Sequence, residues 1–222
     1  MTSFKAGFGR AEITPKLGCQ MVGYGNRKSG ATGVHDPLLA RALVVEDEGG
    51  AWALVSNDLC YTNINTVNAI RAAVTARSGI PGEHVLVANT HTHSGPHDAH
   101  AQNWQRPLAE IIADAVAMAY ESRQPAQIGS GYGVLYGYSI NRRWLDRPID
   151  PGIAVLRIDD LNGQPLGFFT NFACHSVVLG YDNYLLSGDW PGYATRKLEE
   201  LFPGTTCLFT QGGSGNINPL VS

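Results

Sequence analysis

The chain has 222 residues, of which 44% are hydrophobic, and a formal net charge of −3. This size and composition predict one globular domain over residues 1–222 with its own core. Lysines and arginines are scattered without a basic stripe, so no nucleic-acid partner is predicted, and no apolar run approaches the about 18 residues that cross a membrane. The sequence leaves the oligomeric state open.

The first predicted elements are mostly strands. Residues 4–13 predict an opening strand, which Thr14-Pro15 ends, and residues 17–36 are Gly-rich and irregular. The β-rich runs 40–47 and 51–58 flank Glu48-Gly49-Gly50, which is a hairpin signal. Apolar residues recur at helical spacing over 63–78 and Gly79 follows them, so a helix is predicted there.

The second part of the chain alternates helices with strands. We predict strands over 84–90 and 205–211, a hairpin over 152–175 turned at 161–164, and helices over 107–123 and 189–202. Asp189 is a candidate cap for the last helix, and Pro191 suits its first turn. Alternation mixed with hairpins predicts an α/β fold, with α+β as the alternative, in which helices flank one mixed β-sheet or two sheets.

Polar residues follow several predicted strands at their carboxyl ends. They are Asp58, His91 and His93, His175, and Asn216 with Asn218. Ligands of open α/β sheets bind outside the carboxyl ends of strands, so we expect these side chains to converge on one pocket. The alternative is that each residue caps a strand or holds a loop.

The segment His91-Thr92-His93 is a candidate metal-binding motif. If it continues a strand, the period-two pleat directs both imidazoles to the same face. Neutral imidazole suits zinc or iron. Surface loops and core histidines also produce this spacing. His97 and His100 follow Gly95-Pro96 and are expected to be loop residues.

Several known catalytic motifs are absent. The metallo-β-lactamase pattern fails because Gly95 and Pro96 stand where an aspartate and a histidine are needed. A (β/α)₈ amidohydrolase barrel needs about 250 residues and eight βα units, and this chain has too few of both. HExxH and a P-loop are missing, and the serine-hydrolase elbow fails at GGSGN because Asn216 replaces the last glycine.

A series of segments resembles, in order, the neutral/alkaline non-lysosomal ceramidase family. The segments are AGFGRAEITP, MVGYG, GVHDPLLARALVV, NTHTHSGP, YSINRR, FACHS, SGDWPGYA and FTQGGSGNINP. They cover nearly the whole chain and only about the first half of that family's catalytic domain. The resemblance implies a zinc-dependent enzyme that uses a zinc-bound water to hydrolyse the N-acyl amide of a small-molecule or lipid substrate.

The resemblance also implies roles for individual residues. His91 and His175 would be zinc ligands, and His93 would lie beside the metal as a proton shuttle or oxyanion partner. Arg142 would stabilise charge that develops on the substrate, although a surface or salt-bridged arginine is an equal alternative.

A second group of residues is expected to line the substrate pocket. It comprises Gly23, Tyr24, Asp58 and Asn218.

Two departures from the family pattern matter. The family's GDVSPN block reads GNINPL here, so Asn218 stands at the serine position and Asn216 at the acidic position, and a serine nucleophile is not supported. The family completes its zinc shell with a Glu and a Tyr further along the chain, and this sequence stops at Ser222. Asp58 or Asp189 could substitute, and we expect a fragment or a shortened relative.

Two alternative functions stay open at this point. One is a non-catalytic binding domain that kept the fold and lost a full metal site, and the other is a metal-dependent esterase or lactonase. With no signal sequence visible, we expect a cytoplasmic protein, or a secreted one if a leader has been removed. The four dispersed cysteines are expected to be buried free thiols in a reducing compartment.

Overall fold

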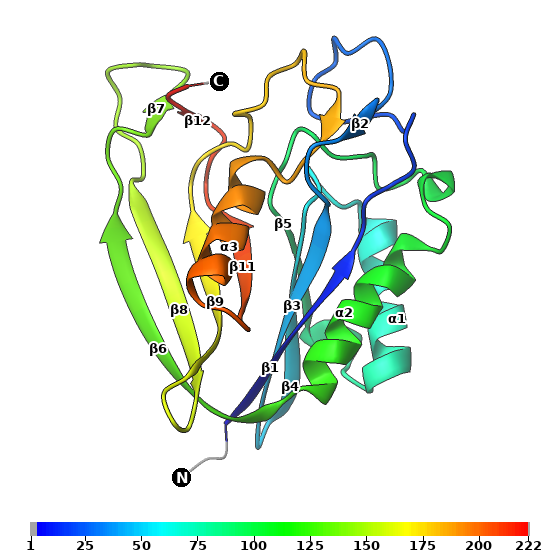
Figure 1. The fold of residues 1–222 in the computed structure, drawn as a ribbon, viewed down its shortest axis with the longest axis vertical. Helices are drawn as coiled ribbons and strands as arrows, with labels where there is room; N and C mark the ends of the chain where they lie inside the picture. Colours follow the sequence, from blue (N-terminus) through cyan, green and yellow to red (C-terminus); the bar gives the residue numbers. More distant parts are fainter. Residues whose placement is uncertain (1–3, 222) are drawn as a thin grey trace.

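The computed structural model describes residues 4–221, and a mixed eight-stranded sheet with flanking helices forms its body (Figure 1). The strands are β1 (Lys5–Glu12), β3 (Leu39–Asp47), β4 (Gly50–Asn57), β5 (Val85–Asn89), β6 (Gln124–Val134), β8 (Gly152–Asp160), β9 (Pro165–Phe172) and β11 (Thr206–Gln211). Their order is β11-β9-β8-β6-β1-β3-β4-β5. The β4–β5 and β9–β11 pairs are parallel and the others are antiparallel, so the predicted mixed α/β fold is confirmed.

The half of the sheet formed by β1, β3, β4 and β5 is covered by two helices, α1 (Ile64–Ser78) and α2 (Leu108–Glu121). In β3 the pleat sends Ala42 and Val44 toward these helices and Leu43 toward the opposite face. The Asn63 side chain caps α1, and Gly79 ends it with φ 74°. This conformation suits glycine because it lacks a Cβ.

The other half contains β6, β8, β9 and β11, and its outer face carries α3 (Asp189–Leu201). Along β11 the side chains again alternate. Leu208 faces inward, and Phe209 packs on Trp190 of α3 with ring centroids 4.9 Å apart.

The two halves fold over one another and enclose a second core. Strand β6 pairs with β1 at only two positions, Lys5↔Pro125 and Ala6↔Gln124, so the sheet can bend there. Leu43 and Leu208, from opposite halves, meet in the cluster between them. This folding brings the carboxyl ends of β4, β5, β9 and β11 to one end of the molecule, as expected from the sequence.

The sequence predicts most elements of this fold and misses several strands. β6 was not predicted because glycines at 129, 131 and 133 interrupt its alternation. The short strands β2 (Gly33–Val34), β7 (Ser139–Asn141), β10 (Leu185–Leu186) and β12 (Ile217–Pro219) were missed as well. The predicted last helix is present, but its N-cap is Gly188, so the cap prediction for Asp189 is wrong. All four cysteines are buried and free, as expected.

Candidate active site

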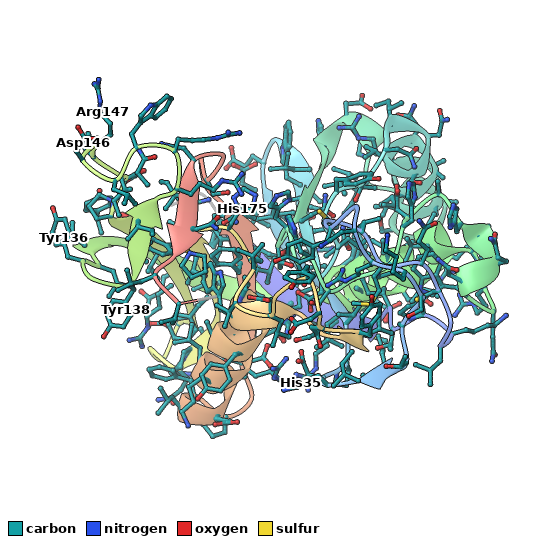
Figure 2. All side chains as sticks on the ribbon, turned by 90° about the horizontal axis from the view of Figure 1, so that it is seen from above. His35, Tyr136, Tyr138, Asp146, Arg147 and His175 are labelled. Atoms are coloured by element: carbon teal, nitrogen blue, oxygen red, sulfur yellow. The ribbon has the colours of Figure 1, made fainter. Side chains whose placement is uncertain are left out.

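Three imidazoles meet beyond the ends of β5 and β9. His91 Nε2 lies 3.1 Å from His175 Nε2 and 3.4 Å from His93 Nε2. The ring centroids of His93 and His175 are 5.4 Å apart, so the three rings form one cluster. Figure 2 shows His175 among the side chains at this end of the molecule. The expected meeting of positions 91 and 175 is therefore present.

The backbone around His91 brings the rings together in a way that the strand pattern does not predict. Strand β5 ends at Asn89, and His91 has φ 63°, a left-handed conformation that is uncommon for a residue with a side chain. Thr92 then forms a parallel bridge with Ser176, whose hydroxyl donates to the Thr90 carbonyl at 2.6 Å. The expectation that a continuous pleat aligns the two imidazoles is thus wrong. A turn held against the segment after β9 aligns them instead.

Backbone carbonyls fix the tautomers of two of the histidines. His91 Nδ1 lies 2.7 Å from the Cys60 carbonyl, and His175 Nδ1 lies 2.7 Å from the Ser214 carbonyl. A carbonyl can only accept, so each Nδ1 carries the proton and each Nε2 carries a lone pair. Two facing lone pairs repel each other unless a metal ion or a shared proton lies between them, and histidine metal ligands are oriented in this way by a carbonyl at the other ring nitrogen.

The spacing of the Nε2 atoms fits a zinc ion. Tetrahedral zinc with Zn–N bonds of about 2.0–2.1 Å places two ligand nitrogens roughly 3.3–3.4 Å apart. The observed separation of the His91 and His175 Nε2 atoms, 3.1 Å, lies close to this value, and His93 Nε2 lies beside this pair, 3.4 Å from His91 Nε2. The donor set is compatible with zinc, and it comes from two distant segments of the chain.

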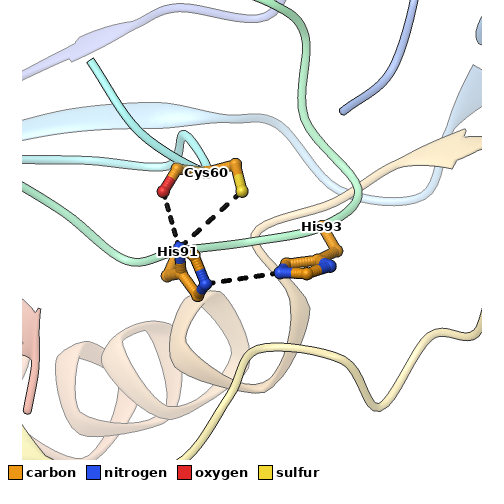
Figure 3. Close-up of side chains that lie close together, drawn as sticks. All are labelled: Cys60, His91 and His93. Atoms are coloured by element: carbon orange, nitrogen blue, oxygen red, sulfur yellow. Dashed lines mark hydrogen bonds between the residues drawn. The ribbon is translucent and has the colours of Figure 1, made fainter. Parts of the chain in front are cut away.

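Cys60 offers an alternative ligand that the sequence analysis missed. Cys60, His91 and His93 lie close enough together to hold a metal ion, with Cys60 Sγ 3.7 Å from His91 Nδ1 (Figure 3). That nitrogen already donates to the Cys60 carbonyl, however, and burial raises the pKa of the Cys60 thiol to about 11. The metal-binding form of cysteine is the thiolate, so the geometry favours His175 over Cys60. The position of Cys60 just after β4, at the same sheet end, could have drawn attention to it.

His93 is held in its neutral form. Burial, followed by the neighbouring His91 and His175 and the positive charges of Arg27 and Arg142, lowers the pKa of His93 to about 4. Burial also lowers the pKa of His175. His93 Nδ1 has no hydrogen-bond partner within residues 4–221. A neutral imidazole with a ring nitrogen free of hydrogen bonds can take up a proton or pass one on.

A polar pocket of about 760 Å³ opens beside His93 and contains most of the expected site residues. Its lining includes Gly23, Tyr24, Arg142 and Asn218. The Tyr24 ring meets His93 edge-on at 5.1 Å between centroids. Gly23 has φ 98°, and a Cβ there would stand 2.4 Å from His93 Cγ, so only glycine lets the backbone pass this close to the ring.

Arg142 reaches the pocket without an acidic partner in the described part of the chain. Its guanidinium donates through Nη2 to the Gly215 carbonyl at 2.8 Å. No carboxylate pairs with it among residues 4–221, which disfavours the salt-bridge alternative. Arg142 is exposed at the pocket wall, so its position agrees with the surface-arginine alternative as well as with a role in the pocket.

The two aspartates considered as substitute ligands are engaged elsewhere. Asp58 is fully buried outside the pocket, where its Oδ2 accepts hydrogen bonds from Leu39 N and Arg41 Nη1, so the expected pocket role of Asp58 is not met. The Asp189 carboxylate accepts from the backbone amides of Val178 and Leu179. Both side chains hold loops at the sheet end.

His97 and His100 lie outside the cluster, in the expected loop. His97 Nε2 is 3.0 Å from the Tyr61 hydroxyl, and His100 stacks on the His97 ring at 4.8 Å.

An apolar groove of about 420 Å³ lies next to the polar pocket. Phe172, Trp190 and Phe209 are among its walls, between α3 and the outer face of the sheet. Val178 lines both the groove and the polar pocket, so the two are neighbours.

Comparison with known proteins identifies the family. The family described as neutral/alkaline non-lysosomal ceramidase, N-terminal, matches residues 4–214. The chain belongs to this family. Neutral ceramidase B of Dictyostelium discoideum is 29% identical over 98% of this chain and 36% of its own length. The neutral ceramidase of Pseudomonas aeruginosa is 29% identical over 97% of this chain and 37% of its own length.

The fold comparison agrees with the family assignment. The crystal structure of the Pseudomonas aeruginosa neutral ceramidase superposes with a TM-score of 0.86 at 29% identity, covering 99% of this chain and 40% of that one. The chain therefore spans less than half the length of the ceramidases that it matches.

The expectation of a cytoplasmic location is wrong. The neutral ceramidases that match this chain are secreted or membrane-associated enzymes. The start of the sequence was not informative on this point. Within residues 4–221, no helix combines the length and the apolar character of a membrane span.

Proposed function

We propose that this chain supplies the N-terminal part of the active site of a zinc-dependent hydrolase that cleaves the N-acyl amide bond of a ceramide-like lipid. The observation that carries the proposal is the pair of Nε2 atoms of His91 and His175, 3.1 Å apart, with both Nδ1 protons committed to carbonyls. Family membership supports the reaction type. On this proposal the chain forms one catalytic unit, with His91 and His175 as zinc ligands.

Bound zinc would lower the pKa of a water molecule toward about 7 and polarise the substrate carbonyl. His93, neutral and 3.4 Å from His91 through their Nε2 atoms, is placed to take a proton at Nε2 and to pass it to the leaving amine. A proton-transferring histidine contributes about 10²–10⁴-fold in rate. Arg142 faces the same pocket and would stabilise negative charge on the carbonyl oxygen.

The shape of the site supports an amphiphilic substrate. The polar pocket of about 760 Å³ has room for a hydroxylated amide head, and the neighbouring apolar groove offers Phe172, Trp190 and Phe209 to a hydrocarbon chain. Removal of such a chain from water is favourable by about 0.8 kcal/mol per buried CH₂. An N-acylated lipid has a polar head for the pocket and a hydrocarbon chain for the groove.

Zinc titration by calorimetry tests the metal site. We expect submicromolar binding to the unmodified protein and a loss of at least about 100-fold in affinity in His91→Ala and in His175→Ala, because each removes a direct ligand. His100→Ala, in the neighbouring loop, is the matched control and should bind like the unmodified protein. Cys60→Ala should also retain binding, since His91 uses the Cys60 carbonyl and not its thiol. Equal affinity in all four variants contradicts the proposal.

A second candidate function, a binding domain without turnover, is favoured by one observation. Asp58 and Asp189, the two aspartates considered as substitute zinc ligands, accept hydrogen bonds from other groups. Neither of them therefore supplies an acidic ligand to the zinc site within residues 4–221. Hydrolysis of N-hexanoyl-sphingosine by the zinc-loaded chain decides between the two. Zinc binding with no release of hexanoate favours the binding domain.

A further inference from the structure

The side-chain oxygen of Asn218, at the polar pocket, has no partner among the described residues. Its Oδ1 is sealed from solvent and has no hydrogen-bond partner within the described residues. It lines the pocket together with His93 and Arg142. A buried acceptor that is left unpaired costs about 1–3 kcal/mol, and native structures rarely keep one without a role.

The backbone holds Asn218 rigidly beside the histidine cluster. It is the central residue of β12, where it lies opposite Ile140 in an antiparallel pair with β7. The preceding residue, Ile217, accepts a hydrogen bond from the His175 backbone amide at 2.9 Å. The backbone of Asn218 therefore cannot move away from the cluster without breaking the contacts that hold His175.

Donor groups of Arg142 and Tyr24, which line the same pocket, are bonded to backbone carbonyls and not to Asn218. Arg142 donates through Nε and Nη2 to the Gly215 carbonyl. The Tyr24 hydroxyl is 3.4 Å from the Leu179 carbonyl. The acceptor on Asn218 is left for a donor that arrives with the ligand.

We propose that Asn218 Oδ1 accepts a hydrogen bond from the N–H of the scissile amide, and so makes the pocket selective for amides over esters. This inference rests on the proposed amide hydrolysis. An N-acyl amide offers a donor at that atom, whereas an ester places an oxygen lone pair there and leaves the buried acceptor unpaired. Sites built to hydrogen-bond a substrate N–H or O–H discriminate strongly against analogues that lack it.

The test compares two matched substrates in the zinc-loaded chain. They are N-hexanoyl-sphingosine and its analogue in which oxygen replaces the amide nitrogen. Asn218→Leu and Asn218→Ala remove the acceptor, while Asn218→Asp keeps an oxygen at the same place. Asn162→Ala, in the exposed turn of the β8–β9 hairpin, is the control.

We expect KM for the amide to rise roughly 10- to 100-fold in Asn218→Leu and Asn218→Ala with little change in kcat, because the lost bond acts on substrate binding. For the ester, KM should change less than about threefold, so the amide preference collapses, and Asn218→Asp should restore most of it. An unchanged amide-to-ester ratio in both Leu and Ala variants overturns the inference. If one variant does not fold, the other decides.

A binding measurement separates this inference from the proposed function. Calorimetry on the zinc-free protein compares the affinities for the same two lipids and needs no turnover. Tighter binding of the amide, lost in Asn218→Leu, supports the inference even if the zinc-loaded chain hydrolyses nothing. Equal binding of both lipids, or no binding of the amide, overturns it.

Discussion

Single backbone conformations decide whether the site forms. His91 in a left-handed conformation aims its ring at His175, and Gly23 lets the chain cross the face of His93. Both are backbone conformations, and each of them positions a side chain that takes part in the chemistry of the site. Strain of about 1–3 kcal/mol at a non-glycine residue such as His91 persists only where surrounding contacts enforce it, and here the Leu59 and Cys60 carbonyls accept from its backbone and ring.

Gly23→Ala should damage the site while the fold survives. A Cβ at this position would stand 2.4 Å from His93 Cγ in a backbone conformation with φ 98°, so His93 must move. We expect kcat for amide hydrolysis to fall by at least about 10-fold, because displacing a proton-transferring group costs a large part of its contribution. Zinc affinity should be nearly unchanged if His91 and His175 provide the ligands.

Gly25→Ala is the matched control for this variant. A Cβ at Gly25 meets no heavy atom within 4 Å, and its φ is not positive. Circular dichroism and steady-state kinetics on both variants provide the measurement. Equal activity of Gly23→Ala and Gly25→Ala would show that the close approach to His93 is irrelevant to catalysis.

At the scale of elements, helix α3 is fixed to the opposite half of the sheet by a carboxylate. Asp36, after β2, accepts from Gly188 N at 3.0 Å and from Arg196 Nη1 at 2.7 Å. Burial alone would raise the pKa of Asp36, but hydrogen bonds from Ser187, His35 and Gly188, with the charge of Arg196, together lower it below its ordinary value. The ionised form is therefore the one that the fold stabilises.

This lowered pKa gives the stability of the protein a defined acid dependence. Because the folded-state pKa lies below the unfolded one, the contribution of Asp36 is complete above the ordinary value of about 3.9 and is lost as the pH falls through the folded pKa. Asp36→Asn should lose about 1–3 kcal/mol at pH 7 and show a shallower loss of stability below about pH 4. Urea unfolding at pH 7 and across pH 2–5 measures both effects. Asp146→Asn, in an exposed loop, is the control, and identical pH profiles for the two variants contradict the assignment.

The sequence predicts the elements better than the details of the site. Hairpins and helices follow from local periodicity and turn residues, and the rule for strand ends correctly places His91, His93 and His175 together. Local pattern does not reveal β6, because its glycines hide the alternation, nor the left-handed turn at His91, because the Thr92–Ser176 bridge that supports it joins segments far apart in the chain. The role of Cys60 is also hidden from the sequence, because it is the backbone carbonyl of Cys60 that orients His91 and not its thiol.

At the scale of the whole molecule, the site lies where the two halves of the folded sheet meet. His91 follows β5 at one edge strand and His175 follows β9 in the other half. No periodicity in the sequence predicts that the sheet bends at the short β1–β6 pairing, yet this bend is what brings the two ligands within 3.1 Å. The candidate metal site is thus also a link between the two halves.

Zinc should consequently stabilise the entire fold. A ligand that binds only the folded state adds about 2.7 kcal/mol at a free concentration 100 times its Kd. For a chain of this size, each kcal/mol shifts Tm by roughly 2–4 °C, so we expect an increase of about 5–10 °C on zinc addition and its reversal by a chelator. Differential scanning calorimetry of the unmodified protein, His175→Ala and His100→Ala measures the effect. His175→Ala should lose most of the shift because it removes the ligand from one half, whereas His100→Ala should keep it. A shift of the same size in His175→Ala would mean that the stabilising zinc binds elsewhere and that the two halves are not joined through this cluster.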